Sequence, residues 1–413
     1  MSDSQPFRDI KVVEFGQFVA VPFCGQLLAE GGAEVIKVES PSGDPNRRMG
    51  EIVPFESRIF VSRNRGKHCL PLKLSEENAK PVIDSLLNWA DVVLMNFRPG
   101  LAQKMGIDSD SLVSRFPQLI IGEITPFGKQ GPDANLSAMD IVVQARSGLM
   151  AAMGRIVDGR PAPGDPVISD YMAAMSLAFG ISSALFRRER TGRGGVVDVS
   201  LMQSAMTLAN NQLVRSEDLD REKHQEIIKG INQQRIDGAT FETQIAAQPS
   251  ARMPALRAIF FRVYDTADGS IAIACASRGL QSRFMKALGF TMDGVDDYDQ
   301  LKLEVEAIVR AKVSDAWLGI LESAGVPVST VKFPLELFED PQAEANDMFY
   351  VLDHPTAGRF RALSPPVKLD GQGFKPQGAT APFATETRAL LDELGFSTDQ
   401  VEVLLKQGVT IER

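Results

Sequence analysis

The sequence predicts an α/β protein with a parallel sheet covered by helices on both faces. Two observations support this fold class. Strand-like and helix-like segments alternate through the first 125 residues. The segments that follow the expected strands are rich in glycine, proline and polar residues, as is usual where such sheets bind ligands. The length of 413 residues further suggests two domains rather than a single core.

The alternation begins with IKVVEF (10–15) as a strand, VPFCGQLLAEGG (21–32) as a helix that its two glycines end, and AEVIKVES (33–40) as a second strand. Further strands are expected at 68–74, 90–97 and 119–125, with helices at 81–90 and around Leu112. Ligands of parallel sheets bind beyond the carboxyl ends of the strands. The loops expected at that edge are GQFVAVP, SPSGDPNRR, NFRPG and TPFGKQGP.

The rest of the chain is less regular. Residues 171–186 predict a buried core helix, interrupted by serines and a glycine and shorter than the ~20 residues of a membrane span. A glycine stop and a strand follow within 187–200. Residues 215–255 are polar and weakly periodic, and are interpreted as a connection into a second domain. That domain would open with a hairpin at 260–277, turning at Asp268-Gly269, and continue with helices to about 323. After strand-and-turn character, a helical end is expected near 384–407.

Composition narrows the function classes. Lysine plus arginine (44) against aspartate plus glutamate (53) gives 44 − 53 = −9, so no global basic field attracts nucleic acid or an anionic membrane. The three cysteines, Cys24, Cys69 and Cys275, lack metal or disulfide spacing, and Cys24 and Cys275 are expected core thiols. The isolated histidines predict no metal site. The start of the chain lacks the features of a signal or transit peptide, and a cytoplasmic location is expected.

Two motifs of the first 70 residues leave alternatives open. GQFVAVP follows a strand and opens a helix, but it has one glycine where a dinucleotide fingerprint needs three. It is therefore either a ligand-contacting loop or a plain turn. The cluster SRNRGKH holds Arg63, Arg65 and Lys67, which could grip phosphates or belong to a solvated charged loop. No GxSxG motif or histidine-paired cysteine indicates nucleophilic serine or cysteine chemistry.

Asp170 lies in GDPVISDYMAAM, between apolar residues and a run of small and apolar side chains. One interpretation is that Ser169 or Asp170 caps the following helix. The other is that the carboxylate is a nucleophile, which a helix start would keep ionised. The two interpretations are compatible.

A resemblance extends these inferences. The segments VVEFGQFVAVPFCGQLLAEGGAEVIKVESPSGDP, NRGKHCLPLKL, ADVVLMNFRPGLAQKMGID, ITPFGKQGP, MDIVVQARSGLM, ISDYMAAM, ALFRRERTGRGGVVDVSL, AGVPVSTV and EDPQ occur in family order over nearly the whole chain. Together they resemble the class III CoA-transferases (CaiB/BaiF type), which include formyl-CoA and carnitine CoA-transferases and are related to α-methylacyl-CoA racemase.

The resemblance implies a large Rossmann-like CoA-binding domain formed by residues 1–215 and 326–413, and a smaller α+β domain with its linker at 216–325. It also implies a homodimer with interlocked chains. By resemblance, Asp170 is the catalytic nucleophile and Asp140 an acidic neighbour that orients substrate or handles a proton.

Residues that would contact coenzyme A also come from the resemblance. Lys104 stands where relatives often carry arginine to bind phosphate, and Leu72 matches an adenine contact. The full expected set is Gln17, Val19, Ala20, Leu72, Asn96, Phe97, Arg98, Leu101, Lys104 and Met105. Met139 stands where racemases carry a histidine, so racemisation is disfavoured. The glycine-run loop of formyl-CoA transferases has no counterpart between 225 and 262.

The expected function is therefore transfer of CoA from an acyl-CoA donor to a small carboxylic acid, through an aspartyl anhydride and an aspartyl-CoA thioester. Neither a metal, a nucleic acid nor a membrane is expected as a partner. Intramolecular CoA migration, 2-methylacyl-CoA racemisation and non-catalytic acyl-CoA binding are the alternatives. Arg146, Arg262 and Arg278 are candidates for holding the acceptor carboxylate.

Overall fold

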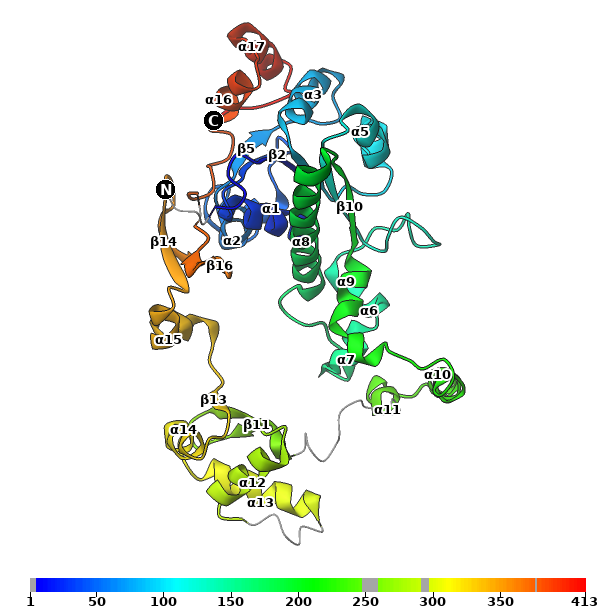
Figure 1. The fold of residues 1–413 in the computed structure, drawn as a ribbon, viewed down its shortest axis with the longest axis vertical. Coiled ribbons are helices and arrows are strands. Elements are labelled where there is room, and N and C mark those ends of the chain that lie inside the picture. The colour runs from blue at the N-terminus through cyan, green and yellow to red at the C-terminus, as the bar shows by residue number, and fades with distance from the viewer. Residues whose placement is uncertain (1–4, 247–258, 291–296, 376) are drawn as a thin grey trace. The chain divides into compact units, whose positions relative to one another are not determined.

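The computed structural model describes residues 5–246, 259–290, 297–375 and 377–413, and the chain divides into two compact units. The large unit comprises Met1–Leu219, Thr240–Ile245 and Ala345–Arg413. The small unit comprises Asp220–Ala239 and Ala246–Glu344. Figure 1 shows the elements of both.

The large unit is built on a six-stranded sheet in which every neighbouring pair is parallel, in the order β10-β7-β6-β1-β2-β5. The strands are β1 (Lys11–Phe15), β2 (Glu34–Glu39), β5 (His68–Pro71), β6 (Val92–Met95), β7 (Ile120–Thr125) and β10 (Gly195–Ser200). All six were expected from the sequence, and the predicted mixed α/β class with a parallel sheet is confirmed. The order reverses between β1 and β6, which creates a topological switch point at their carboxyl ends.

Successive strand residues face opposite sides of the sheet, and each side has its own core. Val12 belongs to a core with α1, α6, α8 and α9, whereas Val13 belongs to a core with α3, α5, α16 and α17. The helices are α1 (Ala20–Glu30), α2 (Arg58–Asn64), α3 (Lys80–Trp89), α4 (Leu101–Met105), α5 (Ser109–Arg115), α6 (Asp140–Arg146), α7 (Leu149–Met153), α8 (Ile168–Thr191), α9 (Leu201–Leu208), α16 (Thr387–Glu393) and α17 (Thr398–Lys406). The unit is thus a sheet between two helical layers.

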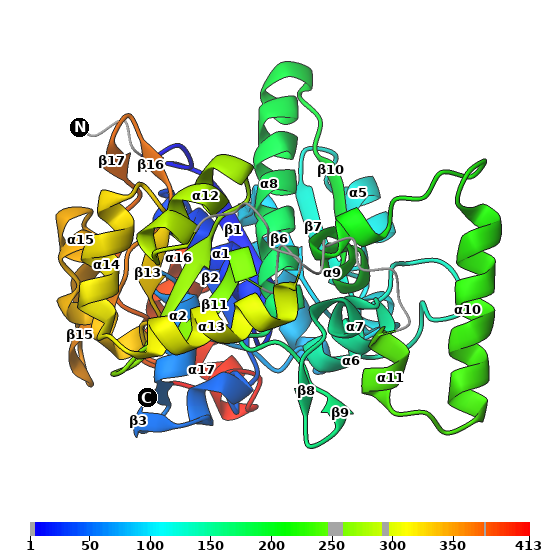
Figure 2. The same cartoon turned by 90° about the horizontal axis from the view of Figure 1, so that it is seen from below.

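Helix α8 is longer than the sequence predicted, because it begins at Ile168 and ends at Thr191, where Gly192 takes a left-handed conformation. It is the one helix of the described residues long and apolar enough to span a membrane by length and composition. It packs on α1, α9, β7 and β10, and Figure 2 shows it beside β10. Gly122 permits this packing, since a Cβ there would lie 3.0–3.1 Å from Ile181 and Leu177. It is therefore a core helix on that face.

The small unit contains a three-stranded antiparallel sheet with helices around a separate core. Its elements are α10 (Arg221–Ile236), β11 (Phe261–Asp265), β12 (Ser270–Ala274), α12 (Arg278–Ala287), α13 (Tyr298–Arg310), α14 (Ser314–Ser323), β13 (Val328–Thr330) and α15 (Pro341–Ala345), which crosses into the large unit by its last residue. The hairpin expected at 260–277 is confirmed, with Asp265 opposite Ser270.

The polar stretch 215–255 differs from its prediction as a connection. Helix α10 occupies 16 of these residues and buries none of them. Because charged and polar residues outnumber its few isoleucines, its hydrophobic periodicity is weak. Residues 247–258 of the stretch lie outside the described residues.

Short elements complete the described chain. They are β3 (Glu51–Val53), β4 (Glu56–Ser57), β8 (Ile156–Val157), β9 (Arg160–Pro161), α11 (Phe241–Ala246), β14 (Phe349–His354), β15 (Gly358–Leu363), β16 (Lys368–Leu369) and β17 (Gln372–Gly373).

Candidate active site

The loops after β1 and β6 meet at the switch point of the sheet. The Gln17 backbone N–H donates to Asn96 Oδ1, and Asn96 Nδ2 donates to the Gln17 carbonyl, both at 3.1 Å. The Phe97 ring lies 5.8 Å from the Phe15 ring between centroids. The structure therefore joins the two loops that the sequence assigned to ligand binding.

Side chains hold three successive carbonyls of the first loop. Asn96 binds the Gln17 carbonyl, Lys37 Nζ donates to Gly16 O at 2.6 Å and Asn46 Nδ2 donates to Phe18 O at 2.6 Å. Phe18 has a φ of 68°, in the left-handed region. These bonds fix the loop before any ligand arrives.

A network of buried charged side chains includes Lys37, which binds this loop. Lys37 Nζ lies 3.0 Å from Glu14 and 3.1 Å from Asp44, and Lys67 Nζ lies 2.7 Å from Glu14. All four side chains are fully buried. Burial raises the pKa of Glu14, but the ammonium groups of Lys37 and Lys67 outweigh it and hold the pKa below its usual value. The ionised network is thus internally compensated.

The basic cluster at 62–68 forms neither a phosphate clamp nor a solvated loop. Lys67 is buried against Glu14, and Arg65 is buried with its Nε 2.6 Å from Glu30. Both alternatives were wrong for these two side chains, because their acidic partners are distant in sequence and could not be paired by inspection. Arg63 alone remains half-exposed.

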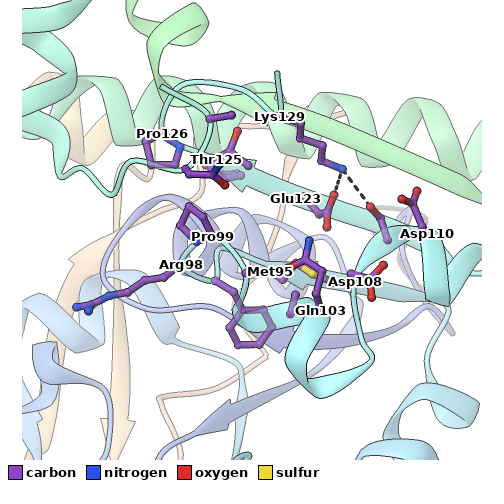
Figure 3. Close-up of a pocket in the computed structure, with 17 residues that line it drawn as sticks. Met95, Arg98, Pro99, Gln103, Asp108, Asp110, Glu123, Thr125, Pro126 and Lys129 are labelled. Atoms are coloured by element: carbon purple, nitrogen blue, oxygen red, sulfur yellow. Dashed lines mark hydrogen bonds and ion pairs between the residues drawn. The ribbon is translucent and has the colours of Figure 1, made fainter. Parts of the chain in front are cut away.

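Two pockets flank α4 at this edge of the sheet. One, of about 230 Å³, is lined by Phe97 and Arg98 and reaches the ends of β6 and β7. In Figure 3, Lys129 points to Glu123, whereas Arg98 extends away from them. The other is lined by Leu101, Lys104 and Met105. Five of the expected CoA contacts thus line one or other pocket.

Three further expected contacts are buried in the protein core. Val19, Ala20 and Leu72 are 6%, 2% and 1% exposed. Val19 and Ala20 open α1, whose first turn has no side-chain cap. These three residues therefore present almost no surface to a ligand in this conformation.

Asp170 and Asp140 are brought together at the start of α8. Asp140 Oδ1 accepts from Ser169 N at 2.8 Å and from Asp170 N at 3.4 Å, and its other oxygen accepts from Gln144. The Asp170 carboxylate has no hydrogen bond or ion pair with the described residues. Burial and the neighbouring charge of Asp140 raise the pKa of Asp170 to about 7, although the Arg63 charge opposes them.

Two expectations about Asp170 are therefore corrected. Neither Ser169 nor Asp170 caps α8, because the helix begins at Ile168 and Asp140 supplies the acceptor from 30 residues away. The helix start also fails to keep the pKa of Asp170 low, since burial and Asp140 outweigh it.

Sequence reasoning missed Gln144 and Tyr171. Gln144 is fully buried, donates to Asp140 and accepts from Gly164 N at 2.9 Å, so it ties the preceding loop to the cap. Its position four residues after Asp140, on one helix face, was an available signal. The Tyr171 ring packs edge-on against Phe23, with centroids 4.9 Å apart. No pattern in the sequence indicated that contact.

The other candidate residues lie in several parts of the chain. Asp170 and Asp140 line neither of the two pockets. Arg146 pairs with Asp133 at 2.8 Å, and Arg262 and Arg278 belong to the small unit. The three cysteines are buried thiols, and the described residues contain no group of three or more histidine, cysteine or acidic side chains placed to hold a metal.

Comparison with known proteins identifies the class of protein. Residues 7–385 match the model of CoA-transferase family III, and the chain belongs to this family.

The names of its relatives differ in the acyl-CoA donor and in the acceptor acid. The chain is 28% identical to cinnamoyl-CoA:phenyllactate CoA-transferase of Clostridium sporogenes, over 98% of this chain and 97% of that protein. It is 29% identical to acetyl-CoA:oxalate CoA-transferase of Acetobacter aceti, over 94% and 95%. A crystal structure of a CaiB/BaiF family protein from Brucella suis matches with a TM-score of 0.75 at 26% identity, over 95% of this chain and all of that one.

Proposed function

We propose that this protein transfers CoA from an acyl-CoA thioester to a carboxylic acid, with Asp170 as the nucleophile. The observation that carries the proposal is that two neighbouring carboxylates at the start of α8 have different hydrogen-bonding partners. Asp140 satisfies the helix amides, so the Asp170 carboxylate is left without a structural partner among the described residues. A half-buried acid with no structural task is a strong candidate for chemistry.

The proposed reaction balances through covalent intermediates. An Asp170 oxygen attacks the acyl carbonyl, the C–S bond breaks, and CoA thiolate leaves a mixed anhydride. The thiolate attacks the aspartyl carbonyl and expels the donor acid, which gives an aspartyl-CoA thioester. The acceptor carboxylate attacks this thioester and releases the thiolate again. Attack of the thiolate on the acceptor acyl group yields the new acyl-CoA and regenerates the Asp170 carboxylate.

The loops at the switch point would hold CoA. Lys104 is exposed and has no ion pair with the described residues, so its ammonium group is available for a phosphate. Asn96 and Lys37 fix the loop around Gln17, and the uncapped amides at the start of α1 are candidates to stabilise oxyanions.

The experiment is intact-protein mass spectrometry with a panel of acyl-CoA thioesters, hydroxylamine trapping and peptide mapping. We expect an acyl or CoA adduct on the peptide that contains Asp170. Asp170→Asn should lose the adduct and lower turnover by about a thousand-fold or more while CoA still binds. Glu189→Gln, an exposed carboxylate of the same helix, is the matched control. If Asp170→Asn kept full turnover, the nucleophile would be another group.

Racemisation finds no support at this site. Met139 is 53% exposed and has no acid–base group, and the Asp140 carboxylate is occupied by hydrogen bonds to Ser169, Asp170 and Gln144. Exchange of an α-proton on both faces of a carbon needs two acid–base groups.

We further propose that the protein acts as a homodimer. The side of α8 turned away from the core carries Met175, Phe179 and Phe186, which are 44%, 77% and 67% exposed. Their spacing of four and seven residues places them on one stripe of the helix. Aromatic side chains this exposed are typical of protein interfaces.

A further inference from the structure

Arg63 lies beside the candidate nucleophile. It belongs to the last turn of α2, and its Nε donates to the Tyr171 hydroxyl at 3.2 Å. The guanidinium carbon is 5.7 Å from the centroid of the Tyr171 ring. Because Tyr171 directly follows Asp170, these contacts place a cation next to the first turn of α8.

This placement is braced by a third helix. The Tyr171 ring meets Phe23 of α1 at 82° between planes, and α1 packs against both α2 and α8. Arg63 is therefore held by elements that also carry the candidate CoA loop and the candidate nucleophile.

Arg63 forms no salt bridge with an acidic side chain of the described residues, although its charge acts on the nearby Asp170. Two other arginines of the large unit, in contrast, form salt bridges. Arg65 is paired with Glu30, and Arg47 is paired with Glu39 and Glu56. The guanidinium groups of Arg65 and Arg47 are thus engaged in salt bridges within the fold. The Nη atoms of Arg63 remain available to bind a ligand.

The proposed reaction needs such a cation. An incoming carboxylate approaches a half-buried site that already contains Asp140 and Asp170, so like charges oppose its entry. When Asp170 becomes a CoA thioester it loses its charge, and the attraction between Arg63 and the Asp170 carboxylate is lost with it. A guanidinium group binds a carboxylate through two parallel hydrogen bonds.

We propose that Arg63 binds a substrate carboxylate at this site, and that it does so in the step in which the acceptor acid attacks the aspartyl-CoA thioester. This inference rests on the proposed function. The carboxylate bound by Arg63 could also belong to the donor, since a dicarboxylic acyl-CoA carries a free carboxylate at the end opposite the thioester.

The test separates the two half-reactions. The protein is loaded with CoA from a monocarboxylic donor such as acetyl-CoA or from a dicarboxylic donor such as succinyl-CoA, and the Asp170–CoA adduct is followed by mass spectrometry. The adduct is then chased with increasing concentrations of acid. The variants are Arg63→Gln and Arg63→Lys, with Arg58→Gln, an exposed arginine of the same helix, as the matched control.

We expect Arg63→Gln to form the adduct from a monocarboxylic donor as the unchanged protein does, but to need roughly 10- to 100-fold more acid for its discharge. Arg63→Lys should need less acid than Arg63→Gln, because lysine keeps the positive charge but cannot form the two parallel hydrogen bonds of a guanidinium group. Slower loading from the dicarboxylic donor alone would also support carboxylate binding and assign it to the donor.

The inference is overturned if Arg63→Gln loads and discharges at unchanged acid concentrations with both donors. A failure of the unchanged protein to form any adduct with the whole donor panel would instead overturn the proposed function, and this inference with it. Circular dichroism and a melting curve identify misfolding, and Arg63→Lys remains informative if Arg63→Gln does not fold.

Discussion

At the scale of single residues, the environment of Asp170 predicts that the proposed reaction depends on pH. Burial and the Asp140 charge raise the pKa of Asp170 to about 7, and only the ionised carboxylate attacks a thioester. We therefore expect the rate of adduct formation to rise with pH and to level off above about 7. Single-turnover rates from pH 5 to 9 measure this. A flat profile would show that the carboxyl is already ionised at pH 5.

The same shift predicts a stability change with a definite sign. Between the ordinary value of 3.8 and about 7, the folded chain binds more proton at Asp170 than the unfolded chain, because its pKa is raised on folding. Folding stability at this site therefore falls as pH rises through that window. Asp170→Asn should raise the melting temperature at pH 8 and leave it nearly unchanged below pH 4. The control Glu189→Gln should change the melting temperature by the same amount at both pH values. An equal shift at both pH values would contradict the raised pKa.

Gly25 illustrates a close approach that the sequence could not reveal. A Cβ at this position of α1 would lie 2.0 Å from Glu14 Oε2, the oxygen that accepts from Lys67. Although alanine favours helices by about 1 kcal/mol over glycine, Gly25→Ala should lower stability because it displaces a buried ion pair. Gly230→Ala, where nothing lies within 4 Å, should instead stabilise α10. Thermal and urea unfolding of both variants provide the comparison.

Local sequence left Asp170 open between a helix cap and a nucleophile, and Asn96 and Lys104 came from the family resemblance; the roles of all three residues stay predictions. The cap supplied by Asp140, the pairing of Lys67 with Glu14 and the contact of Arg63 with Tyr171 all join distant segments, so no local pattern could indicate them.

At the scale of elements, the start of α8 depends on Asp140. Its carboxylate accepts from two backbone amides of the first turn, one of them that of Asp170. Asp140→Ala should lower the free energy of unfolding by about 1–2 kcal/mol, the usual cost of a lost helix cap. It should also shift the pH profile of adduct formation to lower pH, because a like charge beside Asp170 disappears.

The variant Asp140→Asn separates these two effects. It keeps an oxygen for the helix amides but removes the charge, so we expect a smaller loss of stability with a similar shift in the pH profile. Urea unfolding and single-turnover rates on both variants are the measurements. A full loss of turnover in Asp140→Asn at every pH would mean that Asp140 transfers a proton itself.

Elements were predictable in proportion to their apolar content. The six sheet strands and the helices between them carry continuous or periodic apolar residues that the cores bury. Helix α10 carries none that is buried, and α8 extends beyond its apolar run at both ends because Asp140 and Gly192 fix its limits. Boundaries set by long-range bonds were therefore less predictable than the elements themselves.

At the scale of the whole molecule, the order of the strands was beyond local prediction. The alternation of strands and helices predicts a parallel sheet, but it does not say where the order reverses. The reversal between β1 and β6 is what joins the loops of Gln17 and Asn96. The two loops that the sequence assigned to ligand binding are thus brought together only by the topology.

The proposed homodimer provides the last prediction. An exposed stripe of Met175, Phe179 and Phe186 would cost hydration free energy in a monomer, since apolar area buried contributes roughly 25 cal/mol per Å². We expect light scattering after size exclusion to give twice the chain mass of 45.0 kDa. Replacing both Phe179 and Phe186 by serine should weaken the dimer, whereas serine at Leu219, an equally exposed side chain of the large unit outside α8, should not. A dimer unaffected by the double substitution would place the interface on another surface, and a monomeric unchanged protein would remove the proposal.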